Sequence, residues 1–424
     1  MSKVVYAASV TAALVIGRAV LTRAASSAAS RSVPLASAGD KGACRAPRSN
    51  PRSGGRLFRG SVVHSLALGQ LQVLHDALLL VSSSGTILEL VDLATFQDDT
   101  ERSQRVHSLT SQGYLLTTLT PTQLLVPGFV DGHAHAPQYA FVGTGMDMPL
   151  LDWLETYTFP CEAKFKDLQF AKEVYRKAVA RSLLSGTTTC SWFATLHLEA
   201  AKELVKTVRE FGQRAHVGKV SMDRNSPAYY VEDTATGLEE VEAFVEWVHA
   251  TTPARAESNS DQADVSTEGV ADEPLVEPLV EPLVTASIIP RFVPSCTSEM
   301  LNGLGALSRS KGPVPTSKSS SSKASSLLPV HSHLSESKAE IEWVKSLHPD
   351  CSSYAEVYNQ HGLMHERSYF AHCVHCEVEG PGEEGGGNGE VELLRSTQAG
   401  VVHCASSNFM LKSGVMNARA MLNR

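Results

Sequence analysis

Two histidines stand two residues apart in the segment FVDGHAHAPQ, directly after the apolar run LLVPGFV. Residues i and i+2 of a strand share a face, so the imidazoles of His133 and His135 would point the same way. At the C-terminal end of a barrel strand that direction leads into the pocket where such barrels keep their active sites. Two neutral imidazoles on one face are a good start for zinc, although sixteen histidines make a chance pair of this spacing expected.

The segment HSHLSE contains a candidate for a third metal ligand and a carboxylate close to it in the chain. His333 ends a strand candidate and is a third ligand candidate, and Glu336 follows three residues later. A water activated by zinc requires a carboxylate that takes its proton and returns it to a leaving group. Glu336 could equally be the first-turn acid of the next helix, where a negative charge is favoured. His331 is interpreted as a core or loop histidine.

The segment FAHCVH ends another strand candidate with His372, which could bind metal or hydrogen-bond the water or the substrate. His375 is interpreted as incidental. The run CVHC resembles the Cys-x-x-Cys of the zinc-dependent nucleobase deaminases, but that signature requires a proline before the first cysteine, and none stands there. One Cys-x-x-Cys without a second pair does not predict a structural zinc site.

These residues lie in a region where apolar runs alternate with amphipathic helical patterns. Helices are predicted at residues 167–185, 198–212 and 239–250, where apolar residues recur at three- and four-residue spacing. Apolar strands separated by such helices predict an α/β fold with a parallel sheet, and seven strands favour a barrel. The strand candidates are residues 124–136, 187–197, 215–223, 286–295, 328–336, 368–375 and 400–408.

The preceding residues 57–123 contain short β-type runs with Ser and Gly between them, which predicts a small N-terminal β domain. Residues 124–424 form the predicted barrel domain. Three low-complexity segments interrupt it and are predicted to be solvated insertions, because they lack the apolar content needed to pack. They are residues 253–284 with the repeat EPLVEPLVEPLV, the Ser/Lys tract 308–326, and the Gly/Glu segment 377–390.

The first 56 residues carry nine Lys or Arg against one acid, Asp40, amid Ser and Ala, a composition that resembles an import peptide. The apolar run near the start is short for a membrane span of ~20 residues. Over the 424 residues, 42% hydrophobic and 19% charged residues with a net charge of −8 indicate an ordinary globular protein without a general attraction to nucleic acid. Eight scattered cysteines favour a reducing compartment.

Six motifs together resemble the guanine deaminase branch of the amidohydrolase superfamily, over residues 57–424 apart from the three insertions. The His-x-His pair and His333 mark the superfamily, whereas PLLDWLETYTFP, Gln138 and the PRF triplet mark the branch. The six motifs are PGFVDGHAHAPQYAFVGTGMDMPLLDWLETYTFP, GTTTCSWFATLH, FGQRAHVGKVSMD, PRFVPSC, HSHLSE and AHC.

The resemblance implies a (β/α)8 TIM-type barrel and one zinc ion held by His133, His135, His333 and an aspartate after the eighth strand. It also implies that Glu336 shuttles protons and that His372 contacts the reacting centre. The purine would be oriented by Gln138, Arg291 and Phe292. This agrees with the chemistry of the side chains, because arginine is a donor-only fork suited to a purine carbonyl and phenylalanine is an apolar wall for a flat ring.

The implied reaction is hydrolytic deamination: water adds to C2 of guanine, and ammonia leaves to give xanthine. Guanine is therefore the expected partner, with no nucleic acid and no membrane span. The resemblance further implies a homodimer and a cytoplasmic location, while the basic N-terminus leaves an organelle as the alternative.

The sequence departs from the family near its C-terminal end, where the strand ending in Gly-Thr-Asp is not present. We therefore expect about seven of eight barrel strands, open edges on the first and seventh strands, and strongly impaired turnover. Two alternatives stay open: another amidohydrolase acting on an amino- or halo-substituted heterocycle, and a non-catalytic interaction protein with the EPLV repeat as a docking tract.

Overall fold

The computed structural model describes residues 54–83, 85–251, 282–310, 327–376 and 389–422. The import-peptide prediction therefore lies outside the described residues, except that Arg56 belongs to a strand and not to the extension. Most of each low-complexity insertion also lies outside them. The edges of the insertions are structured, because Val284 lies in a strand and Ser308 and Glu390 lie in helices, each of them buried.

The chain forms two units, Met1–Phe129 with Leu183–Thr188, and Val130–Ser182 with Thr189–Arg424. The first unit contains one sheet in the order β3-β2-β1-β4, and β5 also pairs with β1. The predicted boundary at residue 124 stays a prediction; β5, which begins there, pairs with β1 of this sheet. The strands are β1 (Gly54–Ala67), β2 (Gln70–Val81), β3 (Ile87–Asp92), β4 (Tyr114–Thr118) and β5 (Leu124–Leu125).

Alternate residues of β1 pack on opposite faces of the sheet. Phe58 joins a buried cluster with Val62, whereas Leu57 joins a second cluster that includes Leu109. Leu109 lies in α1 (Asp99–Ser111), which begins at Asp98, whose side chain accepts a hydrogen bond from the backbone of Glu101. The sequence analysis did not predict this helix, because only one of its residues is buried and its sequence is mostly polar.

The second unit places seven strand positions in chain order, all parallel where their pairing is recorded. One half has the order β10-β8-β7-β6, and the other has β12-β13-β14. A bridge between Ile288 and Val330 joins the two halves. The strands are β6 (Phe129–His135), β7 (Thr187–Phe193), β8 (Arg214–Gly218), β9 (Val220–Ser221), β10 (Val284–Ala286), β11 (Ile289–Pro290), β12 (Val330–Leu334), β13 (Ser368–His372) and β14 (Gly400–Val402).

Within the described residues no strand pairing joins β14 to β6. The two strands nevertheless approach each other. A Cβ added at Gly132 in β6 would lie 2.9 Å from the side chain of Val402 in β14. The absence of a side chain at Gly132 therefore admits Val402 into the space between these two strands.

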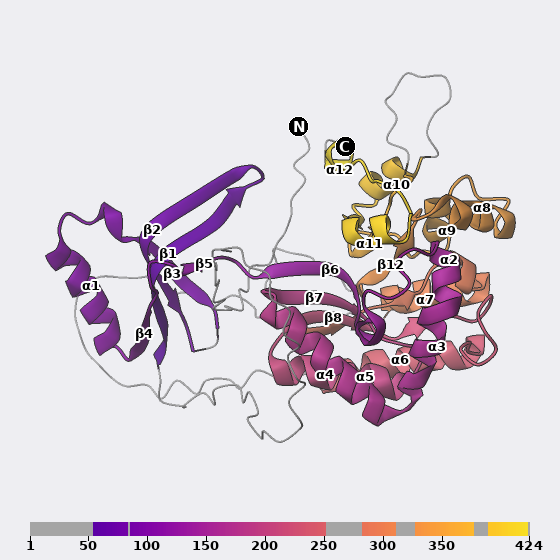
Figure 1. Ribbon diagram of the computed structural model, residues 1–424, viewed down its shortest axis with the longest axis horizontal. Helices are drawn as coiled ribbons and strands as arrows, with labels where there is room; N and C mark the ends of the chain where they lie inside the picture. Colours follow the sequence, from indigo (N-terminus) through magenta and orange to yellow (C-terminus); the bar gives the residue numbers. More distant parts are fainter. Residues whose placement is uncertain (1–53, 84, 252–281, 311–326, 377–388, 423–424) are drawn as a thin grey trace, which may run out of the picture. The chain divides into compact units, whose positions relative to one another are not determined.

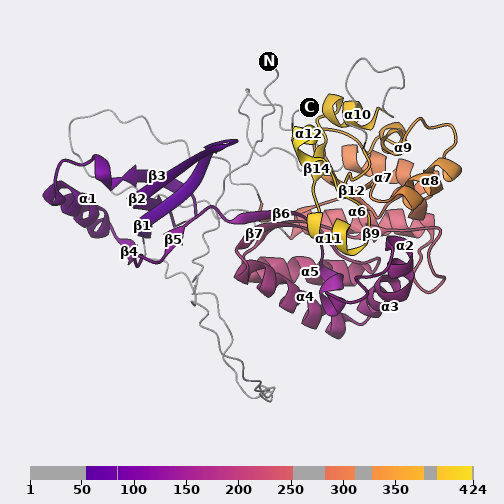
Figure 2. The ribbon, with the colours of Figure 1, turned by 45° about the horizontal axis from the view of Figure 1, so that its top comes forward.

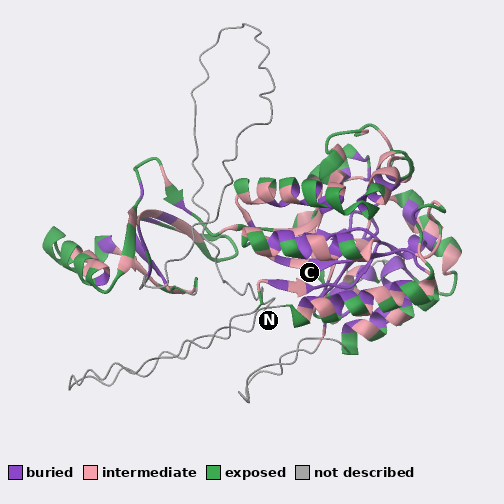
Figure 3. Cartoon of the chain, turned by 90° about the horizontal axis from the view of Figure 1, so that it is seen from below, coloured by how far each residue is buried: buried purple, intermediate pink, exposed green. Residues whose placement is uncertain are grey.

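Helices connect the strands and cover the barrel from outside, as Figures 1 and 2 show for α4 and α5 beside β6, β7 and β8. The three predicted helices are confirmed as α4 (Leu168–Leu184), α5 (Leu198–Phe211) and α6 (Thr234–Ala250). The strands between them are largely buried (Figure 3). Later helices are α7 (Ser298–Ser310), α8 (Lys338–Leu347), α9 (Tyr354–Gln360), α10 (Glu390–Ser396), α11 (Ala405–Met410) and α12 (Ala418–Leu422). No helix in the described ranges is long and apolar enough to cross a membrane.

Candidate active site

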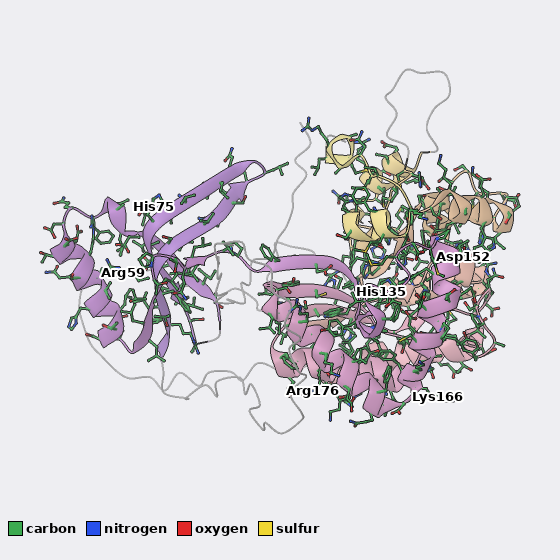
Figure 4. All side chains as sticks on the ribbon, viewed as in Figure 1. Arg59, His75, His135, Asp152, Lys166 and Arg176 are labelled. Carbon is green, nitrogen blue, oxygen red and sulfur yellow. The ribbon has the colours of Figure 1, made fainter. Side chains whose placement is uncertain are left out.

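One cavity of about 240 Å³ in the second unit is lined by every residue that the sequence analysis assigned to the site. These residues come from strand ends and the loops after them, although they are up to 239 positions apart in the chain (133 to 372). Figure 4 labels His135, which is the last residue of β6. The eight residues are His133, His135, Gln138, Arg291, Phe292, His333, Glu336 and His372.

The histidines converge because β6, β12 and β13 end at the same side of the barrel. Possible ligand atoms of His133, His333 and His372 all lie within 4.8 Å of one another. The Nε2 atom of His135 lies 3.2 Å from Nε2 of His333. Two nitrogen ligands at ~2.0–2.1 Å from a tetrahedral ion are separated by about 3.3 Å, so this pair fits a shared metal.

The protonation state of the cluster also suits a metal. Burial, and then the neighbouring histidines, hold the pKa of His133 and of His135 well below the usual value. The same causes lower the pKa of His333. The imidazoles are therefore neutral, which is the state that offers a lone pair to a cation. Within the described chain this ligand cluster contains histidines alone.

The orientation of two of these rings is set by hydrogen bonds. His333 Nδ1 lies 2.6 Å from the backbone oxygen of Arg291, so that nitrogen carries the proton and Nε2 is left as the electron-pair donor. His133 Nδ1 lies 2.8 Å from His331 Nε2. His331 is fully buried in the barrel, which confirms its interpretation as a core histidine, but its contact with His133 was not predicted. The spacing of two residues in HSH was the available signal.

Glu336 and His372 lie next to each other in the cavity. Glu336 Oε2 lies 3.3 Å from His372 Nε2, and Glu336 Oε1 accepts a hydrogen bond from the hydroxyl of Ser413. Burial raises the pKa of Glu336, with the Ser413 hydrogen bond as the opposing effect, so its proton affinity is closer to neutral pH than that of an exposed carboxylate. Asn408 Oδ1 accepts from His372 Nδ1 at 2.7 Å, which leaves Nε2 facing Glu336.

The backbone supports a functional role for this part of the cavity. Ser335, His372 and Cys373 have positive φ angles of 48°, 74° and 46°. Non-glycine residues in this region of backbone angles are uncommon and gather at functional sites.

The alternative role of Glu336, as the first-turn acid of a helix, is wrong, because α8 begins at Lys338 and its capping acid is Glu340.

The opposite wall of the cavity carries the residues predicted to bind the purine. Phe292 is 5% exposed and belongs to a buried apolar cluster, and its ring centroid lies 6.1 Å from that of Trp343. Gln138 lies in the 3₁₀ turn Ala136–Phe141 directly after β6. Arg291 is 2% exposed and follows β11.

Arg291 has a buried partner that the sequence analysis missed. Its Nη1 and Nη2 donate to the two carboxylate oxygens of Glu162, at 2.6 and 3.1 Å. Glu162 ends the short helix α3 (Phe159–Glu162), in the segment after PLLDWLETYTFP. Asn408 and Ser413 were missed as well. No residue spacing in the sequence relates any of the three to its partner.

A parallel barrel whose strand ends present neutral histidines and a buried acid in one cavity defines the class of metal-dependent hydrolases. The amidohydrolase family model matches residues 124–424. The chain therefore belongs to the amidohydrolase family.

Individual relatives agree with this assignment. The guanine deaminase of Dictyostelium discoideum is 40% identical over 371 residues, which cover 87% of this chain and 70% of the relative. The human guanine deaminase is 32% identical over 367 residues, covering 86% and 68%.

Solved structures give the same result. A guanine deaminase of C. acetobutylicum with guanine bound in its active site is 32% identical, with a TM-score of 0.66, covering 87% of this chain and 72% of that one. The E. coli guanine deaminase has the same TM-score at 27% identity, covering 86% and 71%. The comparisons confirm the barrel-type fold and a hydrolase acting on C–N bonds.

Proposed function

We propose that the chain is a guanine deaminase that uses one zinc ion to convert guanine and water into xanthine and ammonia. The observation that carries the proposal is the single cavity lined by all eight residues assigned from the resemblance. The named relatives support guanine over the other amino- or halo-substituted heterocycles.

His133, His135 and His333 would hold the metal. The 3.2 Å separation of two Nε2 atoms and the neutral state of the rings support this ligand set. Zinc, when bound, lowers the pKa of water toward ~7 and polarises the bond under attack.

Glu336 would move the protons. Deamination requires both protons of the water to be moved: one passes to the ring nitrogen as the oxygen bonds to C2, and the other passes from the new hydroxyl to the amine, so that the bond from C2 to the amine breaks and ammonia departs. A carboxylate with a raised pKa performs both transfers efficiently near neutral pH. His372, held by Asn408, keeps its Nε2 toward Glu336 and would contact the reacting centre.

The purine would be bound by three side chains. Phe292 offers an apolar face to the flat ring, while Gln138 and Arg291 offer hydrogen-bonding groups to its edge. The apolar residues Leu150, Trp153 and Leu411 line the same cavity and exclude water from the ring. The homodimer and the cytoplasmic or organellar location stay predictions.

The test is ammonia release by the purified, zinc-loaded chain with guanine, measured beside a panel of pterins, 8-oxopurines and aminotriazines. We expect guanine to have the highest kcat/KM of the panel. Higher kcat/KM for another heterocycle would replace guanine as the substrate, and binding of guanine without any release of ammonia would support the non-catalytic alternative.

A further inference from the structure

The carboxylate of Glu162 forms a clamp on the guanidinium of Arg291, which lines the cavity. Both groups are almost completely buried, with side-chain exposures of 0% and 3%. The two hydrogen bonds use both terminal nitrogens of the arginine, at 2.6 and 3.1 Å. A guanidinium held at both nitrogens cannot turn about its own axis without breaking one of the two bonds.

Two aromatic residues complete the clamp. The hydroxyl of Tyr230 donates to Glu162 Oε2 at 2.8 Å, so the carboxylate is itself fixed on a second side. The ring of Phe159 lies 5.2 Å from Arg291 Cζ, within the range of a cation–π contact. Tyr230 is 1% exposed and Phe159 is 3% exposed. The guanidinium is therefore ordered before any ligand enters, which lowers the entropic cost of binding.

The clamp also neutralises the charge of Arg291 beside a site for a metal cation. Burial opposes the charged form of Arg291, but the charge of Glu162 and the hydrogen bonds to it raise the pKa of the arginine overall. Without Glu162, the buried positive charge of Arg291 would have no counter-charge. Arg291 already helps to lower the pKa of the nearby His135. Glu162 thus allows an arginine to stand close to a divalent ion.

The clamp determines which ligand groups can bind to the arginine. A guanidinium has five N–H donors and no acceptor. Glu162 takes one on each terminal nitrogen, and because Arg291 lines the cavity its other N–H groups can donate to an acceptor on the ligand. A purine with a carbonyl oxygen provides that acceptor, whereas a purine without it leaves a buried donor without a partner.

We propose that Glu162 is a positioning residue for Arg291, and that it thereby determines the preference of the cavity for a purine with an oxygen at C6. This rests on the proposed function, because Arg291 is assigned to the purine. The role of Glu162 is to hold the orientation of the donor, and it contacts neither the substrate nor the reacting atoms.

Two unreactive ligands test this without turnover. Hypoxanthine carries the C6 oxygen and purine does not, and neither has a 2-amino group to lose. We would measure both dissociation constants for the zinc-loaded chain by calorimetry. A hydrogen bond to a charged group contributes ~1.5–3 kcal/mol, so the wild type should bind hypoxanthine roughly 10- to 100-fold more tightly than purine.

In Glu162→Gln this preference should fall by about tenfold or more, with purine binding changed by less than about threefold. Glu232→Gln is the matched control, because Glu232 is also a buried glutamate paired with a buried cation, Lys219, but does not line the cavity. We expect it to leave the preference unchanged. Retention of the preference in folded Glu162→Gln, or an equal loss for both ligands, would overturn the proposal.

Tyr230→Phe removes one hydrogen bond to Glu162 and keeps the Arg291 ion pair, so it tests the proposal even if Glu162→Gln does not fold. We expect an intermediate loss of preference, and an unchanged preference would overturn the clamp. A wild type that prefers hypoxanthine but releases no ammonia from guanine would overturn the proposed activity and still support the role of Glu162.

Discussion

The Nδ1 atom of His133 lies 2.8 Å from the Nε2 atom of His331, so one buried imidazole orients another. The ring of His331 is itself packed against Tyr369, with centroids 4.4 Å apart. Because β12 presents residues i and i+2 on one face, His331 and His333 reach the same cluster from one strand. The histidine nearer the start of the strand thus orients His133, the proposed ligand on β6.

This contact predicts that His331→Leu weakens metal binding. Loss of the hydrogen bond frees the ring of His133, and partners of this kind contribute ~10- to 100-fold to metal affinity. Chelator competition on the folded variant measures the change. His365→Leu, at a buried histidine outside the cavity, is the control. Equal zinc affinity in wild type and His331→Leu would show that the contact has no such role.

Glu336→Gln should lower kcat by ~10²–10⁴-fold and change KM little, since the amide keeps the size of the side chain but cannot carry the proton. Steady-state kinetics with guanine measure both constants. Glu342→Gln, at a side chain 71% exposed on α8, should leave them at the wild-type values. A Glu336→Gln variant with normal kcat would remove this residue from the proton path.

Lys219→Met should destabilise the second unit by about 3–5 kcal/mol, because it leaves the buried carboxylate of Glu232 without its cation. Adding Glu232→Gln to this variant should recover part of the loss. Urea unfolding measures all of these changes. Lys345→Met, in a pair whose side chains are 59% and 71% exposed, should change stability by less than about 1 kcal/mol. Similar losses for the buried and exposed lysines would contradict this account.

His216 predicts a pH dependence of stability. Burial lowers its pKa from 6.5 to about 4, so between these values the unfolded chain binds a proton that the folded chain does not. Its contribution to stability is therefore present above pH 6.5 and is lost as the pH falls toward 4. Between pH 7.5 and 5, wild type should lose about 1–2 kcal/mol more than His216→Gln. Parallel urea unfolding curves at both pH values check the difference, and equal losses would contradict it.

The sequence predicted the features that repeat along the chain or depend on local spacing. The helical periodicity located α4, α5 and α6, and the two-residue spacing in HAH drew attention to a pair of histidines that lines the cavity. These patterns are visible because the residues involved are close together in the chain. Helix α1 was not predicted, because a mostly polar helix has no clear apolar face in its sequence.

The partners of the site residues could not be predicted. Arg291 and Glu162 are 129 positions apart, and Glu336 and Ser413 are 77 apart. Nothing in either local sequence distinguishes a glutamate that clamps an arginine from one on the surface. Such pairs are set by how β11, α3 and the turns around them pack, which is a property of the folded barrel.

Arg291 takes part in two interactions at once. Its backbone oxygen accepts a hydrogen bond from His333, and its side chain, which lines the cavity, is paired with Glu162. A movement of this one residue therefore alters both the ring that would hold the ion and the donor that would hold the purine. Binding of the two ligands would then be thermodynamically linked, and by reciprocity zinc must change the affinity for the purine by the same factor as the purine changes the affinity for zinc.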